Sequence, residues 1–181
     1  MKTYVIYLTI IAAIVTSCTV LKVSNKQKDG YFLHSKNAVT LINSSIDLDK
    51  NKELIVVPNG VFMRGMVEKI SYFDTVITVD DLEKEIIRNG KQDEVGSLSG
   101  RIGLSNAYKK YKKFLYLSFE FNPKDKKRLQ IKLIIPDKFQ EIFVAETAFD
   151  DVWAGVNDKN TFNPLFNSLI NYIYDNSKTY K

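Results

Sequence analysis

The pattern that most constrains the fold is a pair of alternating segments in the second half of the chain. Apolar and polar residues largely alternate over 115–121 and again over 129–135. A period of two places alternate side chains on opposite faces of a strand. A polar loop, 122–127, joins the two segments. We therefore expect an antiparallel hairpin with one face against a core, and a third strand over 141–148 that continues the meander.

The segments before this hairpin alternate between strand and helix signals. Residues 53–57 form an apolar run rich in β-branched residues, which Pro58 stops, and this is typical of a strand buried on both faces. Apolar residues recur at helical spacing from Met63 to Phe73. A second strand is expected over 75–79, and scattered apolar residues over 31–49 indicate one or two short edge strands or a segment that straps across the domain.

Two short helices are expected next. Asp80, followed three residues later by Glu83, resembles a capping box, so we expect a helix over 81–88. A glycine-containing loop follows, and a further short helix is expected from Ser105 to Lys113. The loops at 90–103 and 149–160 are both open as binding sites.

The last element is a helix that begins at Pro164, because proline is favoured in the first helical turn. Its apolar stripe predicts an amphipathic C-terminal helix that packs back across the sheet. The expected order is β-α-β-α-(α)-β-β-β-α. We therefore expect one globular α/β or α+β domain over residues 31–181, a two-layer mixed sheet with helices on one side.

The N-terminus carries a different pattern, which indicates where the protein is delivered. A lysine at position 2 precedes an uncharged apolar run from Tyr4 to Val15, the length expected for a secretory signal. The next residues, Val15-Thr16-Ser17-Cys18, resemble the lipobox of bacterial lipoproteins. The resemblance implies that residues 1–17 are a signal peptide, cleaved before Cys18. It also implies that the thiol of Cys18 carries a diacylglycerol, with a further acyl chain, such as palmitate, usually on the new N-terminus.

An uncleaved membrane helix over 4–21 is the alternative, since this stretch is uncharged and close to the roughly 20 residues needed to span a bilayer. Polar residues interrupt it, and its end matches a processing pattern, which favours cleavage. Both interpretations export the folded part of the chain. Thr19 follows Cys18 where Asp would resemble an inner-membrane retention signal. The resemblance therefore favours the outer membrane, facing the periplasm, over the inner membrane or the cell surface.

Residues 18–30, from the lipidated Cys18 onward, are polar and basic and lack periodicity. This composition predicts a short flexible tether. Each buried CH₂ of an acyl chain contributes about 0.8 kcal/mol to membrane binding, so three chains make a durable anchor where one is marginal.

At the level of architecture, the expected domain resembles a group of small envelope lipoproteins. Their domain is similar to the amino-terminal domain of the TolB translocation protein, and the group includes penicillin-binding-protein activators. The points of resemblance are the lipobox Cys18, the tether, the strand that ends at Pro58, the capped helix 81–88 and a closing hairpin with Trp153 before the last helix. No residue-specific motif is matched, so no binding residues are carried over. The resemblance implies an accessory or assembly factor that contacts other cell-envelope proteins.

The residue inventory argues against common catalytic and metal sites. The chain has one Cys and one His, which excludes the usual Cys/His zinc sites and restricts a Ser-His or Cys-His arrangement to His34. No pair of carboxylates stands out as an acid/base couple. We therefore expect a non-catalytic domain without metal or cofactor.

Two basic clusters are candidate contacts for an anionic surface. They are Lys109, Lys110, Lys112 and Lys113, and Lys124, Lys126, Lys127 and Arg128. In an exported protein, lipid headgroups or lipopolysaccharide are better partners for them than nucleic acid. A binding module for an anionic lipid or small ligand is therefore the alternative function. The competing interpretation is that both clusters are solvated faces beside apolar strands, where Lys discourages aggregation.

Two further residues are candidate contacts for a partner protein. Trp153 is the one tryptophan of the chain, and Trp is enriched at interaction hot spots. Arg64 lies near the start of the expected first helix, where it can face an anionic group. The oligomeric state is left open.

Overall fold

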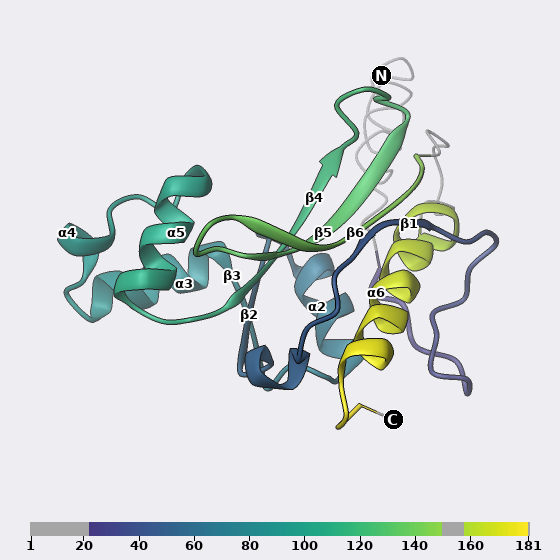
Figure 1. Cartoon of the computed structure of the whole chain (residues 1–181), viewed down its shortest axis with the longest axis horizontal. Helices are drawn as coiled ribbons and strands as arrows, with labels where there is room; N and C mark the ends of the chain where they lie inside the picture. The colour runs from purple at the N-terminus through teal and green to yellow at the C-terminus, as the bar shows by residue number, and fades with distance from the viewer. Residues whose placement is uncertain (1–21, 150–157, 181) are drawn as a thin grey trace, which may run out of the picture.

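The computed structural model describes residues 22–149 and 158–180, with a six-stranded mixed sheet at its centre (Figure 1). The strands are β1 (Val39–Asn43), β2 (Leu54–Val57), β3 (Thr75–Thr78), β4 (Leu115–Phe121), β5 (Arg128–Ile135) and β6 (Gln140–Ala148). Their order in the sheet is β1-β6-β5-β4-β2-β3. The neighbours β1, β6, β5 and β4 pair antiparallel. The neighbours β4, β2 and β3 pair parallel. The expected hairpin and third strand are thus confirmed.

Helices are found near the predicted positions, with one exception. They are α2 (Val61–Ile70), α3 (Val79–Arg88), α4 (Gln92–Val95), α5 (Gly100–Lys110) and α6 (Asn163–Asn176), with a 3₁₀ turn η1 (Leu48–Asn51) and a π-helical turn η2 (Asp158–Phe162). The exception is α4, which lies within the stretch 90–103 that the sequence predicted as a loop. The mixed class and the C-terminal helix are confirmed. Within the described residues, no helix is long and apolar enough to cross a membrane.

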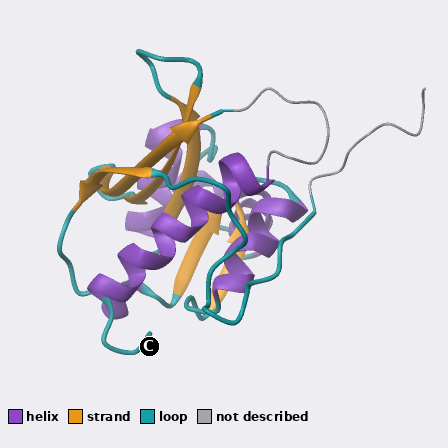
Figure 2. Cartoon of the chain, turned by 90° about the vertical axis from the view of Figure 1, so that its right-hand side faces the viewer, coloured by secondary structure: helices purple, strands orange, loops and turns teal. Residues whose placement is uncertain are grey.

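Helices cover both faces of the parallel part of the sheet, whereas the sequence predicted helices on one side. Ile55 and Val57 of β2 belong to the larger core cluster, which includes residues of α2 and α6. Leu54 and Val56, which point the other way, pack with residues of α3 and α5. The four residues of β2 are all buried, and a strand without a polar face requires cover on both sides. Figure 2 shows α6 crossing the sheet on one face. We call the two faces the α6 face and the α5 face.

The antiparallel part of the sheet is apolar on the α6 face and polar on the α5 face. Leu117 and Leu133 are buried in the cluster that α6 completes. Their neighbours Ser118 and Lys132 point to the α5 face and pair across β4 and β5. The period of two in the sequence therefore reflects one core face and one face of polar side chains.

Two helices begin at other residues than expected. Thr78 caps α3, since its hydroxyl accepts from the Asp81 amide (3.1 Å) and the Asp81 carboxylate accepts from the Thr78 amide (3.2 Å). The expected Asp80–Glu83 box is therefore replaced by Thr78–Asp81. Helix α5 starts at Gly100 rather than at Ser105. Position 103, within α5, requires glycine, because a Cβ there would stand 1.9 Å from the carbonyl oxygen of Ser97.

The N-terminal segment from residue 22 onward lies on the domain, between α2 and α6. Val23 packs on Gly65 of α2, where an added Cβ would lie 2.5 Å from Val23 Cγ2. Lys26 Nζ donates to the carbonyl oxygen of Ile70 at 3.0 Å. The buried Phe32 exchanges two hydrogen bonds of 2.8 Å between its backbone and the Asn167 side chain. The sequence predicts a flexible tether over 18–30, and in the structure Val23, Ser24 and Lys26 of this stretch contact α2, which no local pattern reveals.

Candidate functional site

The two ends of the sheet differ in chemistry. The parallel strands β2 and β3 both end at one edge of the sheet, and we call this edge the carboxyl end. We call the opposite edge the amino end. Strand β2 pairs with β4 at Leu115 and Tyr116, so the rest of β4 continues past β2. The β4–β5 loop, 122–127, therefore projects beyond the carboxyl end (Figure 1), whereas the β5–β6 turn, 136–139, lies at the amino end. The seven steps of β5 separate them by about 23 Å.

The first basic cluster lies at the amino end, and each of its lysines has a partner within the chain. The pairs are Lys109 with the Asp137 carboxylate (3.3 Å), Lys110 with the Glu94 carbonyl oxygen (2.8 Å), Lys112 with the Glu85 carboxylate (3.0 Å) and Lys113 with the Tyr108 ring centroid (5.6 Å). The hydrogen bond to Glu85 raises the pKa of Lys112 above its ordinary value. Exposed pairs of this kind contribute only about 0–1 kcal/mol each, yet the two carboxylates offset the charges of Lys109 and Lys112.

The second cluster lies at the carboxyl end, and three of its members differ from the fourth. Lys124, Lys126 and Lys127 are exposed on the hairpin loop, and they make no ion pair with any described residue. Arg128 stands at the base of the loop, with its Nε 2.6 Å from Glu146 Oε1. Within the described residues, the structure thus separates three lysines without an ion pair from five basic residues that are engaged internally.

The hairpin loop that carries these lysines is held by its own hydrogen bonds. The Asn122 and Asp125 side chains accept from the amides of Lys124 (2.9 Å) and Lys127 (3.0 Å). Two backbone bonds close the loop, from the Asn122 amide to the Arg128 carbonyl (2.9 Å) and from the Arg128 amide to the Asp125 carbonyl (3.0 Å). The lysines therefore project from an ordered backbone.

A buried carboxylate fixes the base of the hairpin. Glu146 is 8% exposed, and its Oε2 accepts from the side-chain amides of Asn122 (2.9 Å) and Gln130 (3.2 Å). Burial alone would raise the pKa of Glu146, but these hydrogen bonds and the charge of Arg128 hold it below its ordinary value. Glu146 is therefore the acceptor that ties the loop base to β6.

A second ionic group lies on the same polar face. Lys132 Nζ stands 3.0 Å from Glu120 and 3.0 Å from Glu141, one carboxylate on each neighbouring strand. Burial opposes the charge of Lys132, but the hydrogen bonds to both carboxylates raise its pKa above the ordinary value. The positive charge of Lys132 is thus offset by carboxylates on β4 and β6.

An exposed aromatic ring accompanies the unpaired lysines. Phe121, the last residue of β4, is 44% exposed, and its ring centroid lies 5.1 Å from that of Phe149. Sequence reasoning missed Phe121 as a surface residue, because its place in the alternation assigned it to the core face. It is exposed because β4 extends beyond the rest of the core.

The start of α2 also lies at the carboxyl end. Val61 is 87% exposed, and the next turn carries Arg64, whose Nε lies 2.8 Å from Glu68 and whose Nη1 lies 3.3 Å from Asp81. The hydrogen bond with Glu68 raises the pKa of Arg64. Arg64 thus links α2 to the start of α3, and its contact with a partner protein stays a prediction.

A groove of about 750 Å³ runs along α2, where the described chain begins. It is lined by Val23, Val61, Arg64, Gly65, Glu68 and Lys69. The groove therefore lies between the N-terminal segment and the exposed start of α2.

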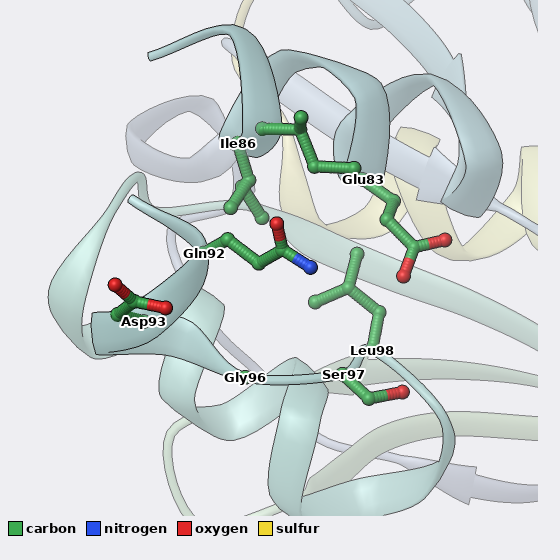
Figure 3. Close-up of a pocket in the computed structure, with 8 residues that line it drawn as sticks. Glu83, Ile86, Gln92, Asp93, Gly96, Ser97 and Leu98 are labelled. Atoms are coloured by element: carbon green, nitrogen blue, oxygen red, sulfur yellow. The ribbon is translucent and has the colours of Figure 1, made fainter. Parts of the chain in front are cut away.

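A separate hollow of about 350 Å³ lies between α3 and α4, in the first part of the loop region 90–103 (Figure 3). Its lining residues are Glu83, Ile86, Ile87, Gln92, Asp93, Gly96, Ser97 and Leu98. Buried Ile86 and Leu98 supply apolar surface, and Glu83 and Asp93 stand on opposite sides. With two carboxylates and no basic side chain in its lining, the hollow suits a cationic group on an apolar stem.

Other residues of interest have structural partners or lie elsewhere. His34 Nδ1 lies 3.1 Å from the Phe32 carbonyl oxygen and 3.0 Å from Asn167 Nδ2. Hydrogen bonds from Ser177, Thr179 and the Lys178 amide, with one from Tyr72, hold the pKa of Asp49 well below its ordinary value. No group of His, Cys, Asp and Glu in the described residues is arranged to hold a metal ion. Cys18 and Trp153 lie outside the described residues.

Comparisons with known proteins give one similar structure. No protein-family model matches the chain, and no curated protein matches it. A solved structure titled "LpoB C-terminal domain from Salmonella enterica (Sel-Met)" is similar over 54% of this chain and 82% of that chain, with 17% sequence identity and a TM-score of 0.32. A likeness at this TM-score carries no argument about the fold or the function of this chain.

Proposed function

We propose that this protein is a lipid-anchored accessory factor of the bacterial cell envelope, which acts by contact with other envelope proteins rather than by catalysis. The acyl chains of Cys18 would hold it at the outer membrane, facing the periplasm. The observation that carries the proposal is the packing of Val23 on Gly65. Because of this contact, the folded domain begins only five residues after Cys18.

The contact of Val23 with Gly65 limits the distance between the domain and its lipid anchor. A chain spans at most about 3.6 Å per residue, so Val23 lies within about 18 Å of Cys18. A domain held so close to one membrane meets other proteins of that membrane at a raised effective concentration. Close tethering therefore suits a protein that works by contact.

The hollow between α3 and α4 is the contact surface that best fits a partner protein. Ile87 at its rim is 50% exposed. The hollow therefore offers the apolar surface of Ile87 beside the carboxylates of Glu83 and Asp93. A Lys or Arg side chain of a partner matches this surface, since its stem is apolar and its end is cationic. Trp153 stays a predicted contact.

The second candidate function is a module that binds an anionic lipid, lipopolysaccharide or a small anionic ligand. The three lysines of the hairpin loop favour it, because they have no ion pair with a described residue, whereas the lysines of the first cluster have partners within the chain. Under this candidate the hairpin is the binding element, and the hollow has no role.

Crosslinking in intact cells, followed by purification and mass spectrometry, tests the proposal. We expect the wild-type chain to capture the same one or two envelope proteins in repeated experiments, and the Cys18→Ala chain to lose them. Ile87→Lys should reduce the capture, while Ile102→Lys, at an exposed position outside the hollow, should leave it unchanged. Equal capture by the wild-type and Cys18→Ala chains would contradict the proposal.

A further inference from the structure

We propose that the anchored domain rests on the membrane through the carboxyl end of its sheet, which contacts anionic phospholipid headgroups. This inference rests on the proposed function, because it takes Cys18 as the lipid anchor. It adds the orientation of the domain, and with it the surfaces that remain free for other proteins.

The path of the N-terminal segment gives the first argument. Val23 lies on Gly65, the Ser24 amide donates to Met66 Sδ at 3.3 Å, and Lys26 reaches the carbonyl oxygen of Ile70. From residue 23 to residue 26 the chain therefore follows α2 from its middle to its end. Followed toward lower numbers, the described chain leads to the start of α2, at the carboxyl end of the sheet.

The short distance to the anchor gives the second argument. Val23 lies at most about 18 Å from Cys18 along the chain, and Gly65 is about 6 Å along the helix axis from Val61. The groove between Val23 and Val61 therefore lies within reach of the headgroup layer. Proximity alone does not select one end, but together with the chain direction it favours the carboxyl end.

The chemistry of the carboxyl end gives the third argument. Lys124, Lys126 and Lys127 project from the hairpin loop without a described partner. A lysine near an anionic membrane surface strengthens binding about fivefold, so three amount to a factor on the order of a hundred. Val61 and Phe121 at this end add exposed apolar and aromatic surface, which suits the headgroup boundary.

Three acidic groups of this end have partners within the chain. Asp81 pairs with Arg64, and the Asp80 carboxylate accepts from the Asn59 side chain at 2.5 Å. Asp125 accepts from the Lys127 amide within the loop. Arg64 therefore offsets the charge of Asp81, whereas Asp80 and Asp125 keep their charges, and the three lysines exceed them in number.

At the amino end, the lysines of the first cluster are paired with Asp137 and Glu85 or contact other groups of the chain. Lys138 in the β5–β6 turn and Arg88 at the end of α3 are exposed without an ion pair among the described residues, but they do not follow one another on one loop as the hairpin lysines do. Ile102, the exposed apolar residue near the β5–β6 turn, shares a hollow with Asp137 and Lys138. In the proposed orientation this end faces away from the bilayer.

Two matched probes test the orientation. Val61 and Ile102 are 87% and 79% exposed, the largest values among the exposed large apolar side chains of the described residues. Val61→Cys and Ile102→Cys chains, purified from membranes with Cys18 acylated, receive a thiol-reactive fluorophore. They are then reconstituted into vesicles of phosphatidylcholine and phosphatidylglycerol that carry a headgroup nitroxide quencher. We expect severalfold stronger quenching at position 61 than at position 102.

Lysine variants test the cause of this difference. Lys124→Gln, Lys126→Gln and Lys127→Gln together should weaken the contact on the order of a hundredfold, so that quenching at position 61 falls to the level at position 102. The matched change of Lys109, Lys110 and Lys113 to Gln should leave the difference intact. Equal quenching at both positions in the wild-type background, or no effect of the hairpin variant, would overturn the proposal.

The mass of the N-terminal peptide separates the two proposals. If Cys18 is acylated and the quenching is equal, the orientation is wrong while the anchored function stands. If Cys18 is unmodified, the proposed function fails. Flotation of that chain with phosphatidylglycerol vesicles then still tests the surface, since the hairpin variant should float on the order of a hundredfold more weakly. Unchanged flotation would overturn the surface as well.

Discussion

The two lysine clusters look alike in the sequence and differ in the fold. At the amino end, Asp137 and Glu85 meet the lysines of the first cluster, whereas the three hairpin lysines of the second have no described partner. The difference lies in the acidic residues brought near each cluster, many positions away along the chain. A run of positive charge is therefore a candidate contact only where the fold leaves it unpaired.

The largest expected effect tests whether the two ends share one cooperative core. Ile131, at 0% exposure, lies in the middle of β5, which connects the ends. Ile131→Ala should lower the free energy of unfolding by about 2–5 kcal/mol, because it leaves a cavity. Ile102→Ala, at an exposed position, should change it by less than about 0.5 kcal/mol. Urea unfolding measures both, and separate transitions for the two ends would contradict a single core.

The next effect concerns the base of the hairpin. Glu146→Ala removes the hydrogen-bond acceptor of Asn122 and Gln130 and the ion-pair partner of Arg128, and we expect a loss of about 1–3 kcal/mol in unfolding free energy. Hydrogen exchange should rise at the hairpin amides and stay unchanged in α5. The matched variant at the amino end, Glu85→Ala, breaks an exposed pair and should cost at most about 1 kcal/mol. Equal losses in the two variants would refute the contrast between the ends.

A smaller effect is expected where the N-terminal segment meets α2. Gly65→Ala places a Cβ 2.5 Å from Val23 Cγ2 and should displace residues 22–30. Alanine favours a helix over glycine by about 1 kcal/mol, so global stability should change little while proteolysis within 22–30 accelerates. Adding Val23→Ala to Gly65→Ala should restore protection. Unchanged proteolysis in the single variant would show that Val23 does not hold the segment.

The smallest effect is a dependence on pH at the hairpin. The folded-state pKa of Glu146 is below its ordinary value, so its contribution is present above the unfolded-state pKa of about 4.3. That contribution is lost as the pH falls through the folded-state value. Hairpin amides should then exchange relatively faster than those of α5, after correction for the intrinsic pH dependence. If the exchange rates of the hairpin amides and of the α5 amides changed by the same factor, Glu146 would not be the group that holds the hairpin base to β6.

Local patterns predicted most of the elements, because alternation and helical spacing report which side chains are buried. The strands β4 to β6 and the helix α6 follow from such patterns. The start of α5 does not, because it depends on how the preceding loop folds back, with Ser97 close to Gly103, and neither apolar spacing nor a capping pattern reports that fold. The cover on both faces of β2 was implied by its unbroken apolar run, yet the sequence interpretation placed all helices on one side.

The candidate site was less predictable than the fold. Both basic clusters were visible in the sequence, but the pairing of Lys109 with Asp137 and of Lys112 with Glu85 depends on the packing of α5 and α3 against their neighbours. The packing of Val23 on Gly65 likewise joins segments 42 positions apart. Only the three-dimensional arrangement separates the unpaired lysines from the paired ones.

The central claim, that Cys18 anchors this domain at a membrane, has a direct measurement. The chain is expressed in full in a bacterium, purified from the membrane fraction, and its N-terminal peptide is weighed by mass spectrometry. The account predicts a peptide that starts at Cys18 and carries a diacylglyceryl group and a further acyl chain. A peptide that still starts at Met1, with an unmodified Cys18 thiol, would contradict it.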